Sequence, residues 1–373
     1  MTARFYFKSA MVNQMEIKID IINDQPEYSG TGVYAWNLYR SLKDRDSLRF
    51  IYYNYETGSC DFLGRSSSER RLPVKKSRFK PLFWNSCSKA YKHNENVHIL
   101  SQNLSFLKPG VRRIITCLDL IPLIMPGSLL EKYWRRILYS GLKKADHIIS
   151  ISQATKDDLI RIYRINPDRI TPIMLGVSPE FHPRDKKECR HKLNLSVKDK
   201  IILHVGTPAP RKNFITVLKA FKQINKSLQN VILLKVGRIS KNESDYILRN
   251  DLSGKIIVRD NIKGKELPLY YAVADILAFP SLYEGFGLPV LEAMASGCPV
   301  ITSNTSSLPE VVGDAGIMID PANQVSLKDR MMELLENSQL SEELAQKGLL
   351  RAQRFTWENT AENTLAVYKR IFG

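Results

Sequence analysis

The sequence predicts an α/β protein with two doubly wound, Rossmann-like domains. Its 373 residues suffice for two domains of ordinary size. Short apolar runs, typical of buried parallel strands, alternate with amphipathic stretches in both halves. A segment rich in proline and turn residues, Asn166 to Pro183, has the composition of a linker. We expect four parts: an N-terminal extension over 1–14, a first domain over 15–175, a second domain over 176–355, and a C-terminal helix over 356–373.

The chain is strongly basic, with 55 Lys and Arg against 38 Asp and Glu and a formal charge of +17. This balance fits a nucleic acid, an anionic membrane or an anionic substrate. The five cysteines have no metal-ligand spacing and indicate no disulfide framework, which favours a cytoplasmic location. No apolar run approaches the ~20 residues needed to span a bilayer.

The first half begins with a strand over Ile17 to Ile22 and a glycine loop. Gly30 and Gly32 precede an amphipathic run, which makes a turn suited to phosphate. The third glycine of the dinucleotide fingerprint is absent, so a nicotinamide cofactor is not expected. A further strand over Val111 to Cys117 leads directly to Asp119, and the end of a strand is a usual place for a functional acid. Asp119 could equally be a structural cap.

The most basic region of the chain is residues 65–92. Its cations and aromatic rings suit an anionic membrane interface, and a solvated loop is the alternative. The same residues could contact nucleic acid, but no nucleic-acid fold motif accompanies them, so that partner is not expected. The cations are Arg65, Arg70, Arg71, Lys75, Lys76, Arg78, Lys80, Lys89 and Lys92, and the rings are Phe79, Phe83, Trp84 and Tyr91.

A second amphipathic stretch starts at a possible capping box, Ser128 with Glu131. Its apolar stripe is Leu130, Trp134, Ile137 and Leu138. We expect this stripe to face the core, and a membrane or acceptor-binding face is the alternative.

The second half opens with a strand over Ile201 to Val205 and the loop GTPAPRKNF. Arg211 and Lys212 lie just before an amphipathic helix for which Asn213 is a plausible N-cap. Arginine can bind two oxygens at once and lysine supplies a point charge. Two cations beside a helix N-terminus are suited to a leaving pyrophosphate.

The most informative stretch is Phe279 to Ser303, which reads as strand, loop, helix, loop and strand. Two acids, Glu284 and Glu292, lie eight residues apart and could face one cleft. Because acids repel phosphate, we assign them to neutral hydroxyls of a sugar or a ribose, with surface acids as the alternative. The amides of the intervening loop and the helix N-terminus favour an anionic ligand. This loop comprises Gly285, Phe286, Gly287 and Leu288.

The phrase YEGFGLPVLEAMASGCPVI resembles the E-x7-E signature of the retaining, nucleotide-sugar-dependent glycosyltransferases of family 4. PRKN and SLPEVVGDAGIMIDP are similar to further motifs of that family. The resemblance implies the GT-B fold, with two domains facing across a cleft and the final helix crossing back to the first domain. It implies retention at the anomeric carbon, no required metal and no cofactor.

The resemblance also implies residue roles. The second domain would bind a nucleoside diphosphate sugar, with Arg211 and Lys212 on the diphosphate. Glu284 would hold the sugar and Glu292 the ribose. Gly30 and Gly32 would face the donor diphosphate and the acceptor. The family often has a histidine before Asp119, where this chain has Leu118. The expected catalytic residues are therefore Glu284, Arg211, Lys212 and Asp119.

We expect transfer of a hexose to a glycan or lipid-linked acceptor in surface polysaccharide or glycoconjugate synthesis. Mannose from GDP-mannose is the first choice and glucose from UDP-glucose the second. Peripheral contact with the cytoplasmic face of an anionic membrane is a further expectation. The alternatives are a GT-B epimerase or hydrolase acting on a UDP-N-acetylhexosamine, and an inactive transferase-like partner protein.

Overall fold

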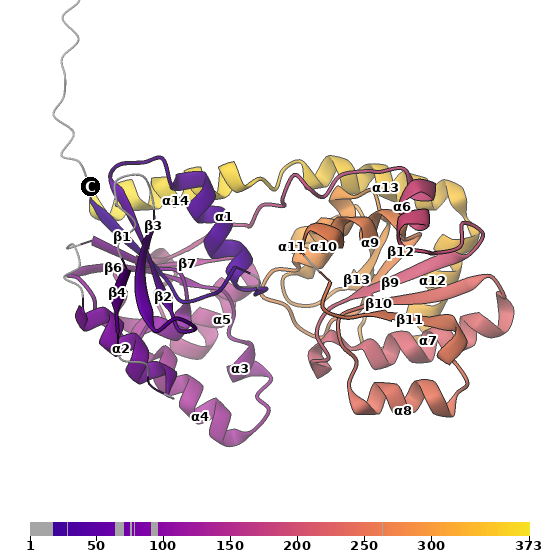
Figure 1. Ribbon diagram of the computed structural model, residues 1–373, viewed down its shortest axis with the longest axis horizontal. Coiled ribbons are helices and arrows are strands. Elements are labelled where there is room, and N and C mark those ends of the chain that lie inside the picture. The colour runs from indigo at the N-terminus through magenta and orange to yellow at the C-terminus, as the bar shows by residue number, and fades with distance from the viewer. Residues whose placement is uncertain are drawn as a thin grey trace, which may run out of the picture.

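The computed structural model contains two α/β domains side by side, and two C-terminal helices joined by a short loop run along one edge of both (Figure 1). The structure describes residues 18–27, 29–63, 71–74, 77, 79–90, 96–262 and 264–373. The proposed extension over 1–14 lies outside these residues, as do most cations of the 65–92 region.

The first domain is built on an eight-stranded sheet in the order β4-β3-β2-β1-β5-β6-β7-β8. At one edge β3 pairs with both β2 and β4 in antiparallel fashion, and the other pairings are parallel. The strands are β1 (Ile19–Asn23), β2 (Leu48–Asn54), β3 (Ser59–Leu63), β4 (Arg71–Pro73), β5 (Asn96–Ile99), β6 (Arg112–Cys117), β7 (His147–Ser150) and β8 (Ile170–Pro172). The helices are α1 (Gly32–Leu42), α2 (Lys80–Ala90), α3 (Ile121–Ile124), α4 (Leu129–Leu138) and α5 (Gln153–Tyr163).

The second domain has a fully parallel six-stranded sheet in the order β11-β10-β9-β12-β13-β14. The strands are β9 (Lys200–Val205), β10 (Val231–Val236), β11 (Ile256–Arg259), β12 (Ile276–Phe279), β13 (Val300–Ser303) and β14 (Ile317–Ile319). The helices are α6 (Lys186–Lys192), α7 (Phe214–Ser227), α8 (Lys241–Arg249), α9 (Leu267–Val273), α10 (Leu288–Ala295), α11 (Leu308–Val312), α12 (Gln324–Glu336) and α13 (Ser338–Ala352). The prediction of two doubly wound α/β domains is confirmed.

Each sheet has a point where the strand order reverses. In the first sheet this point lies between β1 and β5, and in the second between β9 and β12. Loops that leave the carboxyl ends of the two flanking strands diverge there, and open α/β sheets bind ligands in the space between them. The sequence of the second domain places Arg211 and Lys212 after β9, and Glu284 after β12.

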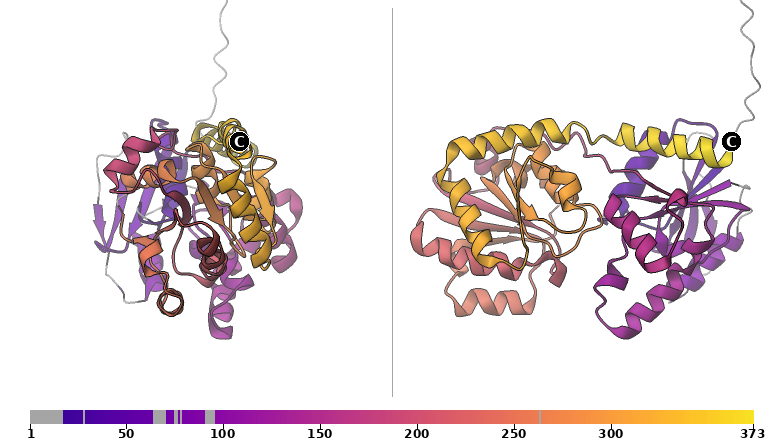
Figure 2. Two further views of the ribbon diagram at one scale, coloured as in Figure 1. Left: turned by 90° about the vertical axis from the view of Figure 1, so that its right-hand side faces the viewer. Right: turned by 180° about the vertical axis from the view of Figure 1, so that it is seen from behind.

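The helix α14 (Trp357–Phe372) runs back from the second domain onto the first, as the rear view in Figure 2 shows. It packs against α1, and the hydroxyl of Tyr368 lies 2.6 Å from Nδ1 of His98 in β5. Burial of His98 lowers its pKa to about 3, so this imidazole is neutral at physiological pH.

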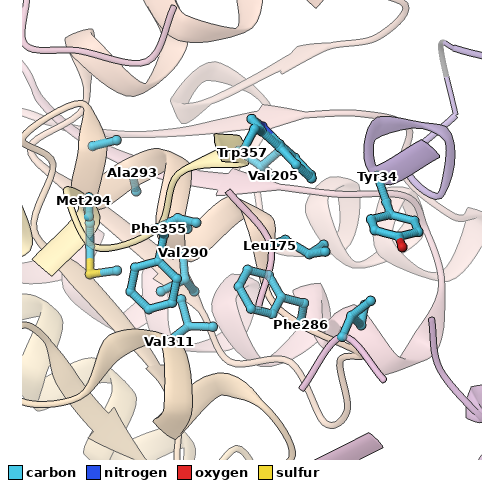
Figure 3. Close-up of a cluster of buried hydrophobic side chains, with 14 of the residues drawn as sticks. Tyr34, Leu175, Val205, Phe286, Val290, Ala293, Met294, Val311, Phe355 and Trp357 are labelled. Atoms are coloured by element: carbon cyan, nitrogen blue, oxygen red, sulfur yellow. The ribbon is translucent and has the colours of Figure 1, made fainter. Parts of the chain in front are cut away.

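One apolar cluster is continuous through both domains. Leu175 of the linker, Phe286 of the loop before α10 and Trp357 of α14 are all at most 5% exposed and belong to it (Figure 3). Because interdomain contacts within a chain are usually more polar, this shared core favours a fixed arrangement of the two domains.

Three local expectations are wrong in whole or in part. Asn213 precedes α7 with a left-handed backbone, but its side chain caps no amide and instead donates to the carbonyls of Pro280 and Pro321 at 3.0 and 2.8 Å. Most of the stripe on α4 does not face the core: Leu130, Trp134 and Ile137 are 67%, 55% and 45% exposed, and only Leu138 of the predicted stripe packs against the core. Of the proposed membrane rings, Phe83 and Trp84 are core residues at 0% and 7% exposure, whereas Phe79 is exposed.

Candidate functional site

The site lies at the switch point of the second sheet, where one carboxylate meets two cations. Arg211 and Lys212 lie in a short 3-10 turn, Pro210–Lys212, after β9. Nη1 of Arg211 is 2.9 Å from Oε2 of Glu284, and Nζ of Lys212 is 2.6 Å from Oε1. The backbone amide of Leu282 also donates to the carbonyl of Arg211 at 2.7 Å, which joins the two loops. The structure therefore brings together three of the four predicted catalytic residues.

The local field keeps Glu284 ionised. Burial alone would raise the pKa of its carboxyl, but the charges of Lys212 and Arg211 outweigh burial and leave the pKa below its usual value. Burial lowers the pKa of Lys212, and Glu284 opposes that shift. Its ammonium also lies 4.7 Å from the ring centroid of Phe279. One carboxylate between two cations leaves an excess positive charge, which suits an anionic ligand.

The loop that carries Glu284 is held by serines that the motif analysis did not single out. Ser281 donates to Oε1 of Glu284 at 2.8 Å, and the Glu284 amide donates to Ser306 at 3.0 Å. The hydroxyl of Ser307 lies 3.0 and 2.7 Å from the carbonyls of Glu284 and Phe286. Small hydroxyl residues are common in loops, so their spacing carried no signal.

The second acid, Glu292, lies within α10 and accepts a hydrogen bond from the hydroxyl of Tyr271 in α9 at 2.7 Å. Glu284 and Glu292 do not lie on one continuous helix, because α10 begins only at Leu288, after Gly287 in a left-handed conformation. Both acids nevertheless act on the ammonium of Lys212. Burial raises the pKa of Glu292 to about 7, so this carboxyl is about half protonated at neutral pH and cancels less of the positive charge.

Replacement of Glu292 by glutamine should stabilise the protein at alkaline pH while weakening ligand binding. The folded-state pKa of about 7 lies above the reference value of 4.5. The native carboxyl therefore holds a proton that the unfolded chain releases, and stability falls as pH rises from 4.5 to 7. Glutamine can still accept from Tyr271 but does not ionise. The difference in Tm between Glu292→Gln and the parent should grow over this window and level off above pH 7; a difference independent of pH would contradict the assignment.

Asp119 belongs to the first domain and lies near the cluster of Arg211, Lys212 and Glu284. Its carboxyl accepts from the amide of Ile121, the first residue of α3, at 3.0 Å and so holds the turn that leads into this helix. Burial raises its pKa, while the charge of Arg211 opposes that rise and the charge of Glu284 adds to it. The second-domain cluster is therefore within electrostatic reach of Asp119.

The two domains touch at Gly285. A Cβ atom at this position would lie 2.4 Å from the carbonyl oxygen of Leu118 and 2.9 Å from Cβ of Asp119. Ser152, the N-cap of α5, donates to the carbonyl of Gly285 at 2.7 Å. The glycine is thus required for close approach of the first domain. Leu118, which stands where the family often has histidine, is 4% exposed and belongs to the shared core.

Glu310 makes a second contact between the domains that sequence reasoning missed. It lies in the first turn of α11, but its carboxylate accepts from the amides of Gln153 and Ala154, both at 2.7 Å. An acid is favourable at a helix N-terminus, and here the helix, α5, belongs to the other domain. The hydroxyl of Tyr283 donates to Asp158 of the same helix. Nothing in a linear pattern indicates that Glu310 caps a helix more than 150 residues away.

Two buried side chains, Lys235 and His204, hold the loop that carries Arg211 and Lys212. Nζ of Lys235, in β10, donates to the carbonyls of Gly206 and Val236 at 2.5 and 3.0 Å. Nε2 of His204, in β9, lies 3.2 Å from the carbonyl of Lys212. Burial lowers the pKa of Lys235 to about 8. These side chains hold carbonyls at both ends of the loop, and their positions in apolar strands gave no functional signal.

Gly30 lies in the loop after β1 and Gly32 begins α1, at the carboxyl end of the sheet that also carries Asp119, because β1, β5 and β6 are parallel. A Cβ at Gly32 would lie 1.9 Å from the carbonyl of Pro26, so the turn requires this glycine, whereas Gly30 faces open space. Among the described residues there is no group of three or more His, Cys, Asp or Glu that could hold a metal ion. In the same part of the chain, no helix is long and apolar enough to cross a membrane.

The chain matches two family models in succession. Residues 28–181 match Glycosyltransferase Family 4, and residues 185–351 match Glycosyl transferases group 1. The chain is 33% identical over 247 residues to the O-antigen chain mannosyltransferase B of Escherichia coli, covering 64% of this chain and 65% of that protein. It is 29% identical over 275 residues to the serotype-specific mannosyltransferase WbdA of Escherichia coli, covering 70% of this chain but 34% of that protein. The matches thus span less than two thirds of either relative.

Solved structures show the same fold. WaaG, a glycosyltransferase involved in lipopolysaccharide biosynthesis, superposes with a TM-score of 0.76 at 18% identity over 95% of this chain and all of that one. HepE of Anabaena, in complex with UDP and glucose, gives a TM-score of 0.73 at 16% identity over 95% and 99% of the two chains. The fold and the paired switch points define a two-domain protein of the GT-B type. The chain belongs to family 4 of the GT-B glycosyltransferases.

Proposed function

We propose that this protein is a retaining glycosyltransferase that moves a hexose, mannose in preference to glucose, from a nucleoside diphosphate sugar to a glycan or lipid-linked acceptor in surface polysaccharide synthesis. The observation that carries the proposal is the pair of cations, Arg211 and Lys212, bound to one buried carboxylate at the switch point. Relatives named as mannosyltransferases of O-antigen chains support mannose and a polysaccharide product.

In the proposed reaction, the bond between the sugar and the diphosphate breaks and negative charge grows on the departing nucleoside diphosphate. Arg211 and Lys212 stabilise that charge from fixed positions, and groups already in place need no reorganisation during the reaction. Charge supplied by side chains makes the reaction metal-independent in this proposal. The amides of Gly285, Phe286, Gly287 and Leu288 add donors beside the N-terminus of α10.

Glu284 has two roles in this proposal. Its carboxylate already accepts from Ser281, Lys212 and Arg211. An ionised carboxyl offers about four acceptor positions, so about one remains for a hydroxyl of the donor sugar. Glu284 therefore orients both cations and also contacts the sugar, while Glu292 takes the ribose hydroxyls.

The acceptor binds on the first-domain side in this proposal. The charges of Arg211 and Glu284 act on Asp119. Gly30 and Gly32 lie at the same carboxyl end of the first sheet. Asp119 and the two glycines are therefore placed to contact the acceptor or the transferred sugar.

The test is a panel of GDP-mannose, UDP-glucose and UDP-N-acetylhexosamine scored by thermal shift and by turnover, with and without EDTA. A ligand at a hundred times its Kd stabilises a protein by about 2.7 kcal/mol, which is readily measured. We expect GDP-mannose to give the largest rise in Tm and a release of sugar that EDTA does not affect. When an acceptor receives the sugar, NMR should show an α-linked product. A changed sugar nucleotide without acceptor would instead identify an epimerase or hydrolase, and no response to any donor would identify an inactive partner protein.

A further inference from the structure

Helix α4 presents its apolar side chains to solvent. Its ten residues contain no buried side chain. The side chains that face outward are large: Leu129, Leu130, Tyr133, Trp134 and Ile137 are 85%, 67%, 61%, 55% and 45% exposed. Leu130, Tyr133, Trp134 and Ile137 recur at the spacing of one helix side, and we call them the α4 face.

Another side of α4 is fixed to the domain through Arg135 and Leu138, and Leu138 packs against the apolar core. Glu131 accepts from the amide of Gly127 at 3.0 Å, and Arg135 donates to Oδ1 of Asn103 at 3.3 Å. Ser105 donates to the carbonyl of Leu138 at 3.0 Å. The orientation is thus set by contacts to the domain and is the reverse of a surface helix, which normally buries its apolar stripe.

A contiguous exposed apolar face on a rigid helix indicates a binding surface. The cations Lys132 and Arg136 are exposed and lie together on the side of the helix that adjoins Tyr133. Within the described residues, neither forms an ion pair, and the single acid of the helix, Glu131, pairs with Arg135 and accepts from the amide of Gly127. Tryptophan and tyrosine favour the boundary of a bilayer, where cations meet anionic headgroups.

We propose that the α4 face binds the interfacial layer of an anionic lipid bilayer. A second copy of this chain fits less well, because pairing two α4 faces would bring the positive charges of Lys132 and Arg136 close to the same charges of the other copy. The surface differs from the one expected at residues 65–92, where Phe83 and Trp84 are buried.

The α4 face also lies close to the site. Arg135, on the inner side of α4, lowers the pKa of Asp119, so the helix is within electrostatic reach of the acid on the acceptor side. In Figure 1, α3 lies on the side of the first domain that faces the second, and α4 lies next to it along the lower end of the first domain. Resting on the proposed function, the inference is that the bilayer lies beside the acceptor side of the site, which suits a lipid-linked acceptor.

The experiment is co-sedimentation of the full chain with vesicles of phosphatidylcholine and phosphatidylglycerol at 3:1, and of phosphatidylcholine alone. We expect at least tenfold stronger partitioning to the anionic vesicles. Leu130→Gln combined with Trp134→Gln should weaken it at least tenfold, and Lys132→Gln with Arg136→Gln should remove the preference for anionic lipid. The matched control is Leu248→Gln with Leu350→Gln, which changes two leucines of the second domain exposed to 66% and 65% and should stay within twofold of the parent.

A spectroscopic readout locates the contact. Of the four tryptophans, Trp84 and Trp357 are buried, Trp36 is half-buried, and Trp134 is exposed. Anionic vesicles should shift the tryptophan emission to shorter wavelength, and Trp134→Phe should bind but lose the shift. Parent-like binding by the Leu130/Trp134 variant would overturn the proposal, as would a dimer of the parent that this variant converts to monomer. Donor turnover without vesicles is measured in parallel. A parent protein that turns over no donor would contradict the proposed function, and the vesicle experiment would still test membrane binding by itself.

Discussion

Glu284→Gln should lower sugar transfer by about 10²–10³-fold, the range found when one preorganised electrostatic contact to a transition state is removed. Glutamine retains the shape and can accept from Ser281. It carries no charge, so Arg211 and Lys212 are left next to each other without a counterion. The two cations should then repel, and their positions relative to the diphosphate should change. The measurement is kcat and KM with the best donor from the panel.

The same substitution should also lower stability. Removing one partner of a buried ion pair costs about 3–5 kcal/mol, and Glu284 is 6% exposed. The control is Glu343→Gln, which breaks the pair with Lys347 on the surface of α13 and should leave both activity and Tm nearly unchanged. Turnover within about threefold of the parent would disprove the role assigned to Glu284.

Lys212→Met should remove the ability of the protein to distinguish a nucleoside diphosphate from a monophosphate. The lysine is 8% exposed and its ammonium is a fixed charge at the switch point, so it should contact the phosphate that a monophosphate lacks. A charge-assisted contact is worth roughly 1.5–3 kcal/mol, or about 10–150-fold in Kd. Methionine keeps the apolar stem against Phe279.

Calorimetric titration with GDP and GMP, and with UDP and UMP, measures this difference directly. The parent should bind each diphosphate more tightly, and Lys212→Met should bind both members of a pair alike. Lys219→Met, an exposed lysine on α7, is the control and should behave as the parent. Undiminished preference for diphosphates in Lys212→Met would remove this lysine from the proposed site.

Local chemistry explains what could be predicted from the sequence. The stretch from Phe279 to Ser303 follows the expected order because each part depends on near neighbours. Gly297, for example, has φ +72° just after α10, as a glycine at a helix C-terminus often does. The two glutamates could be singled out because the glycine loop lies between them.

The contacts that could not be predicted are those between distant segments. That Glu310 caps α5, and that Gly285 accommodates Leu118, depends on how the domains meet. The spacing of apolar residues in α4 showed that one side of the helix is apolar, but such a spacing does not say which side faces the domain. Here Arg135 and Leu138 decide the orientation through Asn103 and Ser105.

The return of α14 to the first domain has a consequence for synthesis. Roughly 180 residues separate β8, the last strand of that domain, from the helix that covers its flank. At about 5–20 residues per second, a ribosome needs on the order of 10–40 s to make them. During that interval the nascent first domain lacks the partner of His98 and the cover over α1. The domain that emerges first is therefore completed last, when the whole second domain has already left the exit tunnel.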